Sequence, residues 1–379
     1  MAPIETMFAG AYAGKRVLVT GHTGFKGSWL SIWLKELGAE VMGYSLTPPS
    51  EPNNFTICKL DTRLQHIVGD VRDFEHLRCA ISDFQPEIVF HLAAQALVRY
   101  SYDVPKTTLE TNIMGTINIL ESIRTTQSVK AFVLVTSDKC YENREQVWGY
   151  KENDPMGGDD PYSASKGAVE IVFRSYLRSY FEKNPELGAA SVRAGNVIGG
   201  GDWGRDRIVP DSVVALSRQE PILVRNPRAI RPWQHVLEPL SGYLWLGARL
   251  LEDPKKYSGG WNFGPADSSA KVVGELAAAI VREWKSGEWR DMSDHNQAAP
   301  HEAAWLRLSC DKVHVMLPWS ATLSFDENIR MTVKWYRHYY ENPESNLYQY
   351  CVHQIREYGT LASQRGQLWT NGHVKRTLH

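Results

Sequence analysis

Short apolar runs rich in β-branched residues alternate along this chain with longer stretches of helical periodicity. Nearly all-apolar strands separated by helices indicate a parallel sheet covered on both faces, because a strand with one wet face would alternate apolar and polar residues. The sequence therefore predicts an α/β fold with a doubly wound parallel sheet of the Rossmann type. Six runs are expected to form its strands: residues 16–20, 40–45, 65–69, 88–92, 131–137 and 190–197.

Bulk composition suggests no macromolecular partner. The 42 basic and 43 acidic side chains nearly cancel, which disfavours nucleic acid and anionic membranes. No segment approaches the roughly 18 unbroken apolar residues of a membrane span, and residues 1–10 lack a signal-peptide pattern. The five cysteines are scattered, and the 12 histidines show no metal-binding spacing. We therefore expect a cytoplasmic enzyme with reduced thiols and no metal, acting on a small molecule.

A glycine-rich turn joins the first predicted strand to the first helix. Glycines there permit a tight turn and bring backbone N–H groups and a helix N-terminus close to a pyrophosphate. A purely structural turn is the alternative, but the strand and helix on either side favour a nucleotide. We predict a dinucleotide site formed by Gly21, Thr23, Gly24, Phe25, Lys26 and Gly27.

The ends of the second and third strands carry the next candidates. Many NAD-binding chains have an acidic residue after the second strand, where it holds the ribose hydroxyls, but this chain has Ser45. Ser45 can bond a hydroxyl or a phosphate, so this position leaves NAD and NADP both open. After the third strand, Asp70 can accept a hydrogen bond from the adenine amino group, with a plain loop carboxylate as the alternative.

Tyr162 and Lys166 are the candidates for the reacting centre. Asp160 can cap a helix with Pro161 in its first turn, which places Tyr162 and Lys166 one turn apart on the same face. A tyrosine acting as a base near neutral pH needs its pKa lowered by roughly 3 units, or about 4 kcal/mol. Lys166 and a positively charged nicotinamide can both lower it. An exposed helical tyrosine and lysine without a role is the alternative.

Ser137 and Asp138 follow the fifth strand. A hydroxyl, a phenol and an amine are what alcohol oxidation needs, whereas Asp138 is a proton donor that simple oxidation does not use. The additional acid indicates that water is eliminated.

Several motifs together resemble the extended short-chain dehydrogenases/reductases. They are residues 21–27, His91-Leu92-Ala93-Ala94, Asn112, Ser137, and Tyr162 with Lys166. Ser137-Asp138 resembles the Thr-Asp pair of the dehydratases in that family. Longer stretches resemble the nucleotide-sugar 4,6-dehydratases that act on CDP-glucose: residues 21–30, 136–143, 199–210 and 231–235. This resemblance, which spans about residues 15–340, implies NAD as cofactor, CDP-glucose as substrate, and Val71, Leu92, Ala93 and Ala94 at the cofactor.

The strand pattern breaks after Gly199 and returns near Trp261. We therefore predict a smaller, interleaved C-terminal substrate domain. The predicted dinucleotide-binding domain comprises residues 1–199 plus about 231–267, and the nucleotide-sugar-binding domain about 200–230 plus 268–350. Residues 351–379 are expected to form a polar, loosely attached tail.

The resemblance also implies roles for the reacting residues. Tyr162 takes the proton of the sugar 4-hydroxyl, steadied by Ser137, and Asp138 protonates the C6 hydroxyl as it leaves. Hydride removed from C4 returns to C6, so the cofactor is regenerated. In related dehydratases a glutamate thought to remove the C5 proton follows the aspartate, whereas this chain has Lys139. Lys139 is a neutral amine base, a cation that stabilises the enolate, or a surface lysine without a role.

Asn196 and Arg231 look like ligands of the substrate pyrophosphate, with Arg205 and Glu302 as further candidates. An ion pair between the lobes is the alternative for Arg231, and cytidine recognition is implied by the resemblance alone. The alternative functions are a dTDP- or GDP-sugar 4,6-dehydratase, a 4-epimerase, which needs no Asp138, and an inactive dinucleotide-binding regulator. Similar enzymes supply dideoxysugars for the O-antigen of bacterial lipopolysaccharide.

One helical stripe suggests self-association. It consists of Ala164, Ala168, Val172, Tyr176 and Tyr180, spaced four residues apart. A homodimer or higher homo-oligomer is therefore expected, with ordinary core packing as the alternative.

Overall fold

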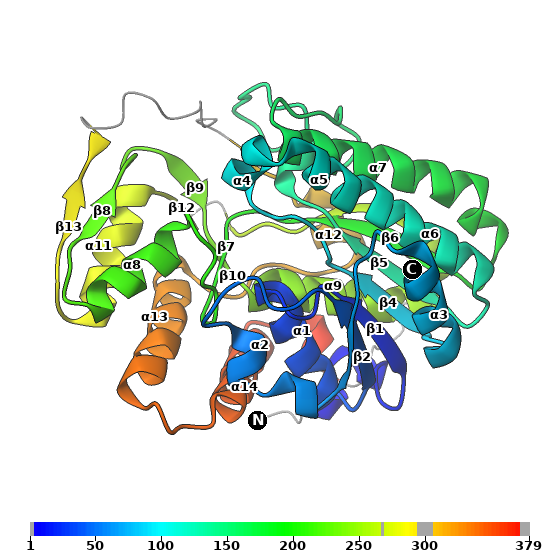
Figure 1. Ribbon diagram of the computed structural model, residues 1–379, viewed down its shortest axis with the longest axis horizontal. Helices are drawn as coiled ribbons and strands as arrows, with labels where there is room; N and C mark the ends of the chain where they lie inside the picture. Colours follow the sequence, from blue (N-terminus) through cyan, green and yellow to red (C-terminus); the bar gives the residue numbers. More distant parts are fainter. Residues whose placement is uncertain (1–3, 267–268, 294–305, 372–379) are drawn as a thin grey trace.

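A seven-stranded parallel sheet organises the computed structural model, which describes residues 4–266, 269–293 and 306–371 (Figure 1). Its strands are β1 (Arg16–Thr20), β2 (Glu40–Ser45), β3 (Gln65–Val68), β4 (Ile88–His91), β5 (Ala131–Val135), β6 (Gly188–Arg193) and β11 (Gly259–Asn262). They lie in the order β11-β6-β5-β4-β1-β2-β3. The order reverses direction between β1 and β4, and ligands of such sheets bind at the carboxyl ends of the strands beside that reversal. The predicted doubly wound fold is confirmed.

Helices cover both faces of the sheet because its strands are apolar on both sides. Val17 and Val19 of β1 face one buried core with α1 (Phe25–Glu36) and α9 (Leu237–Glu252). Leu18 faces a second core. The second core is covered by α3 (Phe74–Phe84), α6 (Gly115–Thr125) and α7 (Pro161–Ser179). Shorter helices are α2 (Asn54–Ile57), α4 (Val98–Asp103), α5 (Pro105–Leu109), α10 (Pro254–Tyr257) and α12 (Asp311–Met316).

The last predicted strand, residues 190–197, is broken in the structure. β6 ends at Arg193, and β7 (Val197–Ile198) pairs instead with β10 (Gln234–His235) in a separate two-stranded sheet. The chain turns at Asn196, whose φ is +52°, a conformation that interrupts a strand. The prediction of one continuous strand is therefore wrong in this segment.

A smaller group of elements lies beside the main sheet, on the left in Figure 1. β8 (Ile222–Val224) pairs with β13 (Trp289–Asp291), and β9 (Ile230–Pro232) pairs with β12 (Ala270–Val272). The helices α8 (Ile208–Ser217), α11 (Val273–Trp284) and α13 (Phe325–Glu341) lie with them. The boundaries between the two domains stay a prediction.

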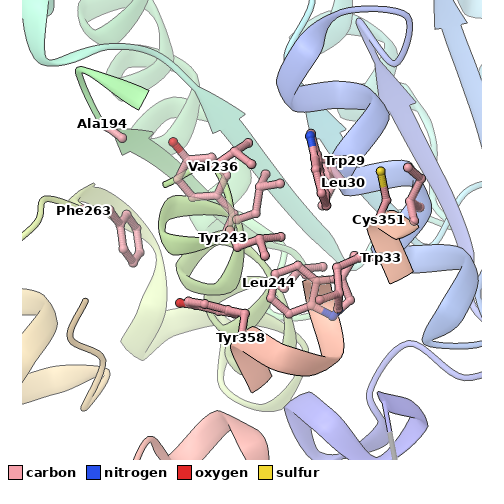
Figure 2. Packing of buried hydrophobic residues seen from close by; sticks show 14 of the residues in the cluster. Trp29, Leu30, Trp33, Ala194, Val236, Tyr243, Leu244, Phe263, Cys351 and Tyr358 are labelled. Carbon is pink, nitrogen blue, oxygen red and sulfur yellow. The ribbon is translucent and has the colours of Figure 1, made fainter. Parts of the chain in front are cut away.

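The C-terminal segment is part of the core. Helix α14 (Leu347–Gln364) buries Cys351 and Tyr358 completely, and the Tyr358 and Trp33 ring centroids are 6.0 Å apart (Figure 2). The prediction of a loosely attached tail is thus wrong for residues 351–371. Its apolar side chains are spaced at helical intervals among many polar ones, so average polarity concealed an amphipathic helix. Residues 372–379 lie outside the described part of the chain.

No described helix is both long and apolar enough to cross a membrane. Within the same ranges, no cluster of three His, Cys, Asp or Glu side chains is arranged to hold a metal ion. All five cysteines lie in the described part of the chain, and none forms a disulfide there.

Candidate active site

The glycine turn after β1 has no room for larger residues. Gly21 has φ of +75°, and a Cβ there would lie 2.7 Å from the Ala93 backbone nitrogen. A Cβ on Gly27 would lie 2.1 Å from the Gly21 carbonyl oxygen. The turn, the start of α1 and the loop after β4 are therefore packed backbone against backbone, as a pyrophosphate cradle requires. Gly24 caps α1 with no side-chain hydrogen bond, which leaves its N-terminus open to an anion.

Other predicted cofactor residues surround this turn. Ser45 is buried at the end of β2, with its hydroxyl 2.9 Å from that of Thr23. Asp70 pairs with Arg72 at 2.6 Å, and the hydrogen bond from Arg72 lowers the pKa of its carboxyl. Val71 is buried, whereas Leu92 and Ala94 are half-buried after β4. The structure thus brings the predicted residues from three strand ends to one edge of the sheet.

Lys26 connects the cradle to the reacting centre. Burial lowers the pKa of its ammonium to about 8, the charge of Asp138 opposes the shift, and Arg207 and Lys166 add to it. The Lys26 ammonium therefore senses the charges of both Asp138 and Lys166.

Ser137 and Asp138 stand directly beyond the end of β5. The Ser137 hydroxyl donates to Asp138 Oδ1 at 3.0 Å, and the Asp138 side chain is 6% exposed. Gly195 lies against this carboxylate, since a Cβ there would be only 1.7 Å from Asp138 Oδ2. Lys139 follows in a 3-10 turn and is half-buried. The acid is thus enclosed, with a glycine where any side chain would displace it.

Helix α7 presents Tyr162 and Lys166, as predicted from its cap. Asp160 accepts a hydrogen bond from the Ser163 N–H at 2.9 Å, and Pro161 occupies the first turn. Both reactive side chains are buried, with the Lys166 ammonium 5.9 Å from the Tyr162 ring centroid. Burial raises the pKa of Tyr162 to about 12, opposed by the Ser137 hydroxyl, and lowers the pKa of Lys166 to about 8. A base role for Tyr162 therefore needs further positive charge at the site.

Two buried residues that no sequence motif indicated, Glu170 and Arg193, connect the elements that carry the site. Glu170, one turn beyond Lys166, accepts hydrogen bonds from Thr136 at 2.5 Å and from Arg193 at 2.8 and 2.9 Å. The ion pair with Arg193 joins α7 to β6, and the hydrogen bond from Thr136 joins α7 to the residue before Ser137. The signal in the sequence was the four-residue spacing of Tyr162, Lys166 and Glu170, which puts all three on one helix face.

Asn112, which entered only as a family motif, joins the loop after β4 to α7. Its amide donates to the Gln95 carbonyl at 3.1 Å and to the Ser165 hydroxyl at 2.8 Å. Asn112 lies in a π-helical turn, residues Glu110–Met114, a distortion frequent at functional sites.

The predicted substrate residues come from different segments of the chain. Asn196 sits at the break after β6, and Arg231 is half-buried on β9. Arg205 is exposed, whereas Arg207 of the same loop pairs with Asp202 at 2.8 Å and lies within electrostatic range of Tyr162. Glu302 lies outside the described residues. A role for each in binding substrate stays a prediction.

A dinucleotide cradle joined to Ser137, Tyr162 and Lys166 at the strand ends of a doubly wound sheet defines an extended short-chain dehydrogenase/reductase. The family model described as GDP-mannose 4,6 dehydratase matches residues 18–332. The chain belongs to this nucleotide-sugar 4,6-dehydratase family.

Individual relatives agree with this assignment. The chain is 50% identical to the CDP-glucose 4,6-dehydratase of Salmonella typhimurium over 334 residues, which cover 86% of this chain and 91% of that enzyme. A probable dTDP-glucose 4,6-dehydratase of Sinorhizobium fredii is 26% identical, covering 85% and 92% of the two chains. The solved structure of Thermus thermophilus UDP-glucose 4-epimerase in complex with NAD superposes with a TM-score of 0.71 at 27% identity, covering 85% and 99%.

Proposed function

We propose that this chain is an NAD-dependent dehydratase that converts CDP-glucose to CDP-4-keto-6-deoxyglucose and water. One observation carries the elimination step: Asp138, an enclosed carboxyl that oxidation alone does not need, stands next to Ser137 in the oxidation set. An epimerase eliminates nothing and has no use for this acid. The choice of CDP-glucose is supported by the 50% identity to the Salmonella enzyme.

The cradle residues fit a dinucleotide, since glycines stand where a Cβ would strike backbone and the first helix turn is open to an anion. The turn at Gly21, Gly24 and Gly27 would hold the pyrophosphate, with Ser45 and Asp70 toward the adenosine. Bound NAD supplies the hydride acceptor for C4 and later the hydride donor for C6.

The remaining chemistry falls to the side chains. Tyr162 removes the proton of the 4-hydroxyl, with Ser137 hydrogen-bonding the same oxygen and Lys166 stabilising the phenolate. The ketone at C4 acidifies the C5 proton. Asp138 then protonates the C6 oxygen, the C6–O bond breaks, and water leaves. Lys139, next to Asp138, stays the candidate for the group that removes the C5 proton or stabilises the enolate.

The test is a product analysis with labelled substrate. Purified protein, NAD and CDP-glucose deuterated at C4 should yield a 4-keto-6-deoxy sugar with the label in its new methyl group. Label that is lost to solvent or that accumulates on reduced cofactor would refute the cycle. Product from dTDP- or GDP-glucose but not from CDP-glucose would overturn the nucleotide assignment, and a C4 epimer would replace the dehydratase by an epimerase.

We also propose that the enzyme is a cytoplasmic homodimer that associates through α5, α6 and α7. Exposed apolar side chains lie on or next to these helices: Leu109 at 37%, Met114 at 49%, Ile171 at 51% and Tyr180 at 47%. Part of the predicted stripe packs within the monomer instead, because Val172 and Tyr176 lie against the second core. The Tyr176 hydroxyl also donates to Glu121 at 2.6 Å. Light scattering should give twice the chain mass for the wild type and the monomer mass for Ile171→Asp. A monomeric wild type would refute the proposal.

A further inference from the structure

A pocket opens beside Asp138. Asp138 and Gly195 form one wall, and residues 264–266 and 306–308 form another. Gln234, on β10, also lines the pocket, together with Pro232 and Ala270. Because Asp138 is the acid of the elimination step, a ligand group in this pocket lies next to the proton donor.

Gln234 has an oriented amide with an unused acceptor. Its side chain is buried, at 2% exposure, and its Nε2 donates to the Gly195 carbonyl at 2.9 Å and to the Phe263 carbonyl at 3.3 Å. Carbonyl oxygens only accept, so these two contacts fix which end of the amide is nitrogen. The Oε1 atom has no hydrogen-bond partner within the described ranges of the chain. Buried acceptors are rarely left unsatisfied in a native protein, and a ligand is one way to satisfy them.

A buried amide oxygen without a partner does not by itself make a site. Gln354 on α14 shows the same pattern, since its Nε2 donates to the Met331 carbonyl at 2.8 Å while its Oε1 is unpartnered. Gln354 lies where α14 packs against α13, away from the pocket beside Asp138. The difference is location: Gln234 lines a pocket that it shares with the catalytic acid.

We propose that Gln234 binds the substrate at its leaving group, with Oε1 accepting a hydrogen bond from the 6-hydroxyl of the hexose. This inference rests on the proposed dehydratase function. A hydroxyl has one hydrogen to donate and lone pairs that accept. When the lone pair of O6 takes the proton of Asp138, the O6 hydrogen must point elsewhere, and an oriented acceptor is its complement.

The arrangement aims the leaving group at its acid. The Asp138 proton goes to O6, the C6–O6 bond breaks with its electron pair on O6, and the C5 proton passes to the base as the C5–C6 double bond forms. The water that departs still carries a hydrogen that Gln234 can hold. A glutamate at this position could not serve as well, because its carboxylate would face the Gly195 and Phe263 carbonyls with no hydrogen to donate.

The test compares two substrates that differ at C6. Enzyme that holds NADH cannot oxidise the sugar at C4, so the reaction does not start. The affinities of CDP-glucose and CDP-6-deoxyglucose can therefore be measured directly. Wild type should bind CDP-glucose more tightly, because both Asp138 and Gln234 contact its 6-hydroxyl. In Gln234→Met that preference should fall by about tenfold, the typical effect of one hydrogen bond, with the affinity for CDP-6-deoxyglucose unchanged. In Gln354→Met, the matched control, the preference should remain.

Kinetics with the NAD form provide a second readout. CDP-6-deoxyglucose can be oxidised at C4 but has no hydroxyl to lose, so reduced cofactor should form at the same rate in wild type and in Gln234→Met. With CDP-glucose, the variant should accumulate reduced cofactor because elimination is slowed. If Gln234→Met lowered the affinity for both substrates by the same factor, or slowed C4 oxidation, Gln234 would have a structural role and the proposal would be overturned.

One measurement needs no variant. CDP-6-deoxy-6-fluoroglucose carries an atom that accepts hydrogen bonds but donates none, and the wild-type NADH form should bind it about tenfold more weakly than CDP-glucose. Binding as tight as that of CDP-glucose would overturn the role of Gln234. A wild type that does not dehydrate CDP-glucose at all would instead refute the proposed function, so the two failures are distinguishable.

Discussion

Gly195→Ala tests whether the position of Asp138 controls the elimination step. The added Cβ would lie 1.7 Å from Asp138 Oδ2 and 2.1 Å from its Cγ. Real Cβ atoms essentially never approach other heavy atoms closer than 3.0 Å, so the carboxyl oxygen must retreat by at least 1.3 Å (3.0 minus 1.7). A displacement of about 1 Å at a reacting group typically costs roughly 100-fold in rate, or about 2.7 kcal/mol of transition-state stabilisation. We expect kcat for the keto-deoxy sugar to fall by about that factor.

The assay separates the two halves of the reaction. Tyr162 and Lys166 lie on α7, so C4 oxidation should persist and reduced cofactor should accumulate in the first turnover. Gly274→Ala is the control, because a Cβ there meets only ordinary contacts at 3.4 Å or more. Full turnover by Gly195→Ala, with a crystal structure showing Asp138 in place beside the new methyl group, would refute the reasoning.

Three further predictions concern charge. Lys166 has a pKa of about 8 and must be protonated to stabilise the Tyr162 phenolate, so kcat/KM should fall as pH rises through about 8; in Lys166→Arg this limb should move higher, and an unmoved limb would exclude Lys166 as its cause. Burial raises the pKa of Glu238 from 4.5 to about 7, so the folded state holds a proton that the unfolded chain releases, and stability falls as pH rises between these values. Urea unfolding should show the stability of Glu238→Gln rising relative to that of wild type as pH increases across that window. A stability difference that does not change with pH would contradict the assignment. Glu170→Gln leaves the buried Arg193 charge without its ionic partner and should lower the free energy of unfolding by about 3–5 kcal/mol. Measured by urea unfolding, the double variant with Arg193→Met should lose less unfolding free energy than the two single variants lose together. Additive losses would refute the coupling.

Local chemistry explains why parts of this fold could be predicted from sequence. The helix that carries Tyr162 begins where Asp160 and Pro161 place it, because a cap and a proline act within one turn. The ends of β1 and β2 were likewise marked by an abrupt change from apolar to glycine or polar residues. The C-terminal helix was missed because its apolar positions are diluted by polar neighbours, and only packing against α1 shows which face is buried.

The site was predictable where a motif lies within a few residues, as in the turn at Gly21 or the pair Ser137-Asp138. Gln234 was missed because its function depends on contacts with Gly195 and Phe263, 39 and 29 residues away along the chain. Its only local signal was a polar residue between the apolar Trp233 and the buried residues that follow. Arg207 was not named as a candidate for a similar reason, since a sequence does not show which guanidinium of a loop pairs with a buried carboxylate such as Asp202.

The break after β6 explains how Asp138 can be buried while its carboxylate still has space beside it. Had the strand continued to residue 197, the backbone at Asn196 would have stayed extended and the pairing of β7 with β10 would not have formed. Instead the turn at Asn196, with φ of +52°, lets its carbonyl accept the Gln234 N–H at 3.2 Å and starts that second pairing. The same turn leaves Gly195, the one residue type without a Cβ, against Asp138. The irregular segment that a strand pattern conceals therefore brings the acid, its space and the amide of Gln234 together.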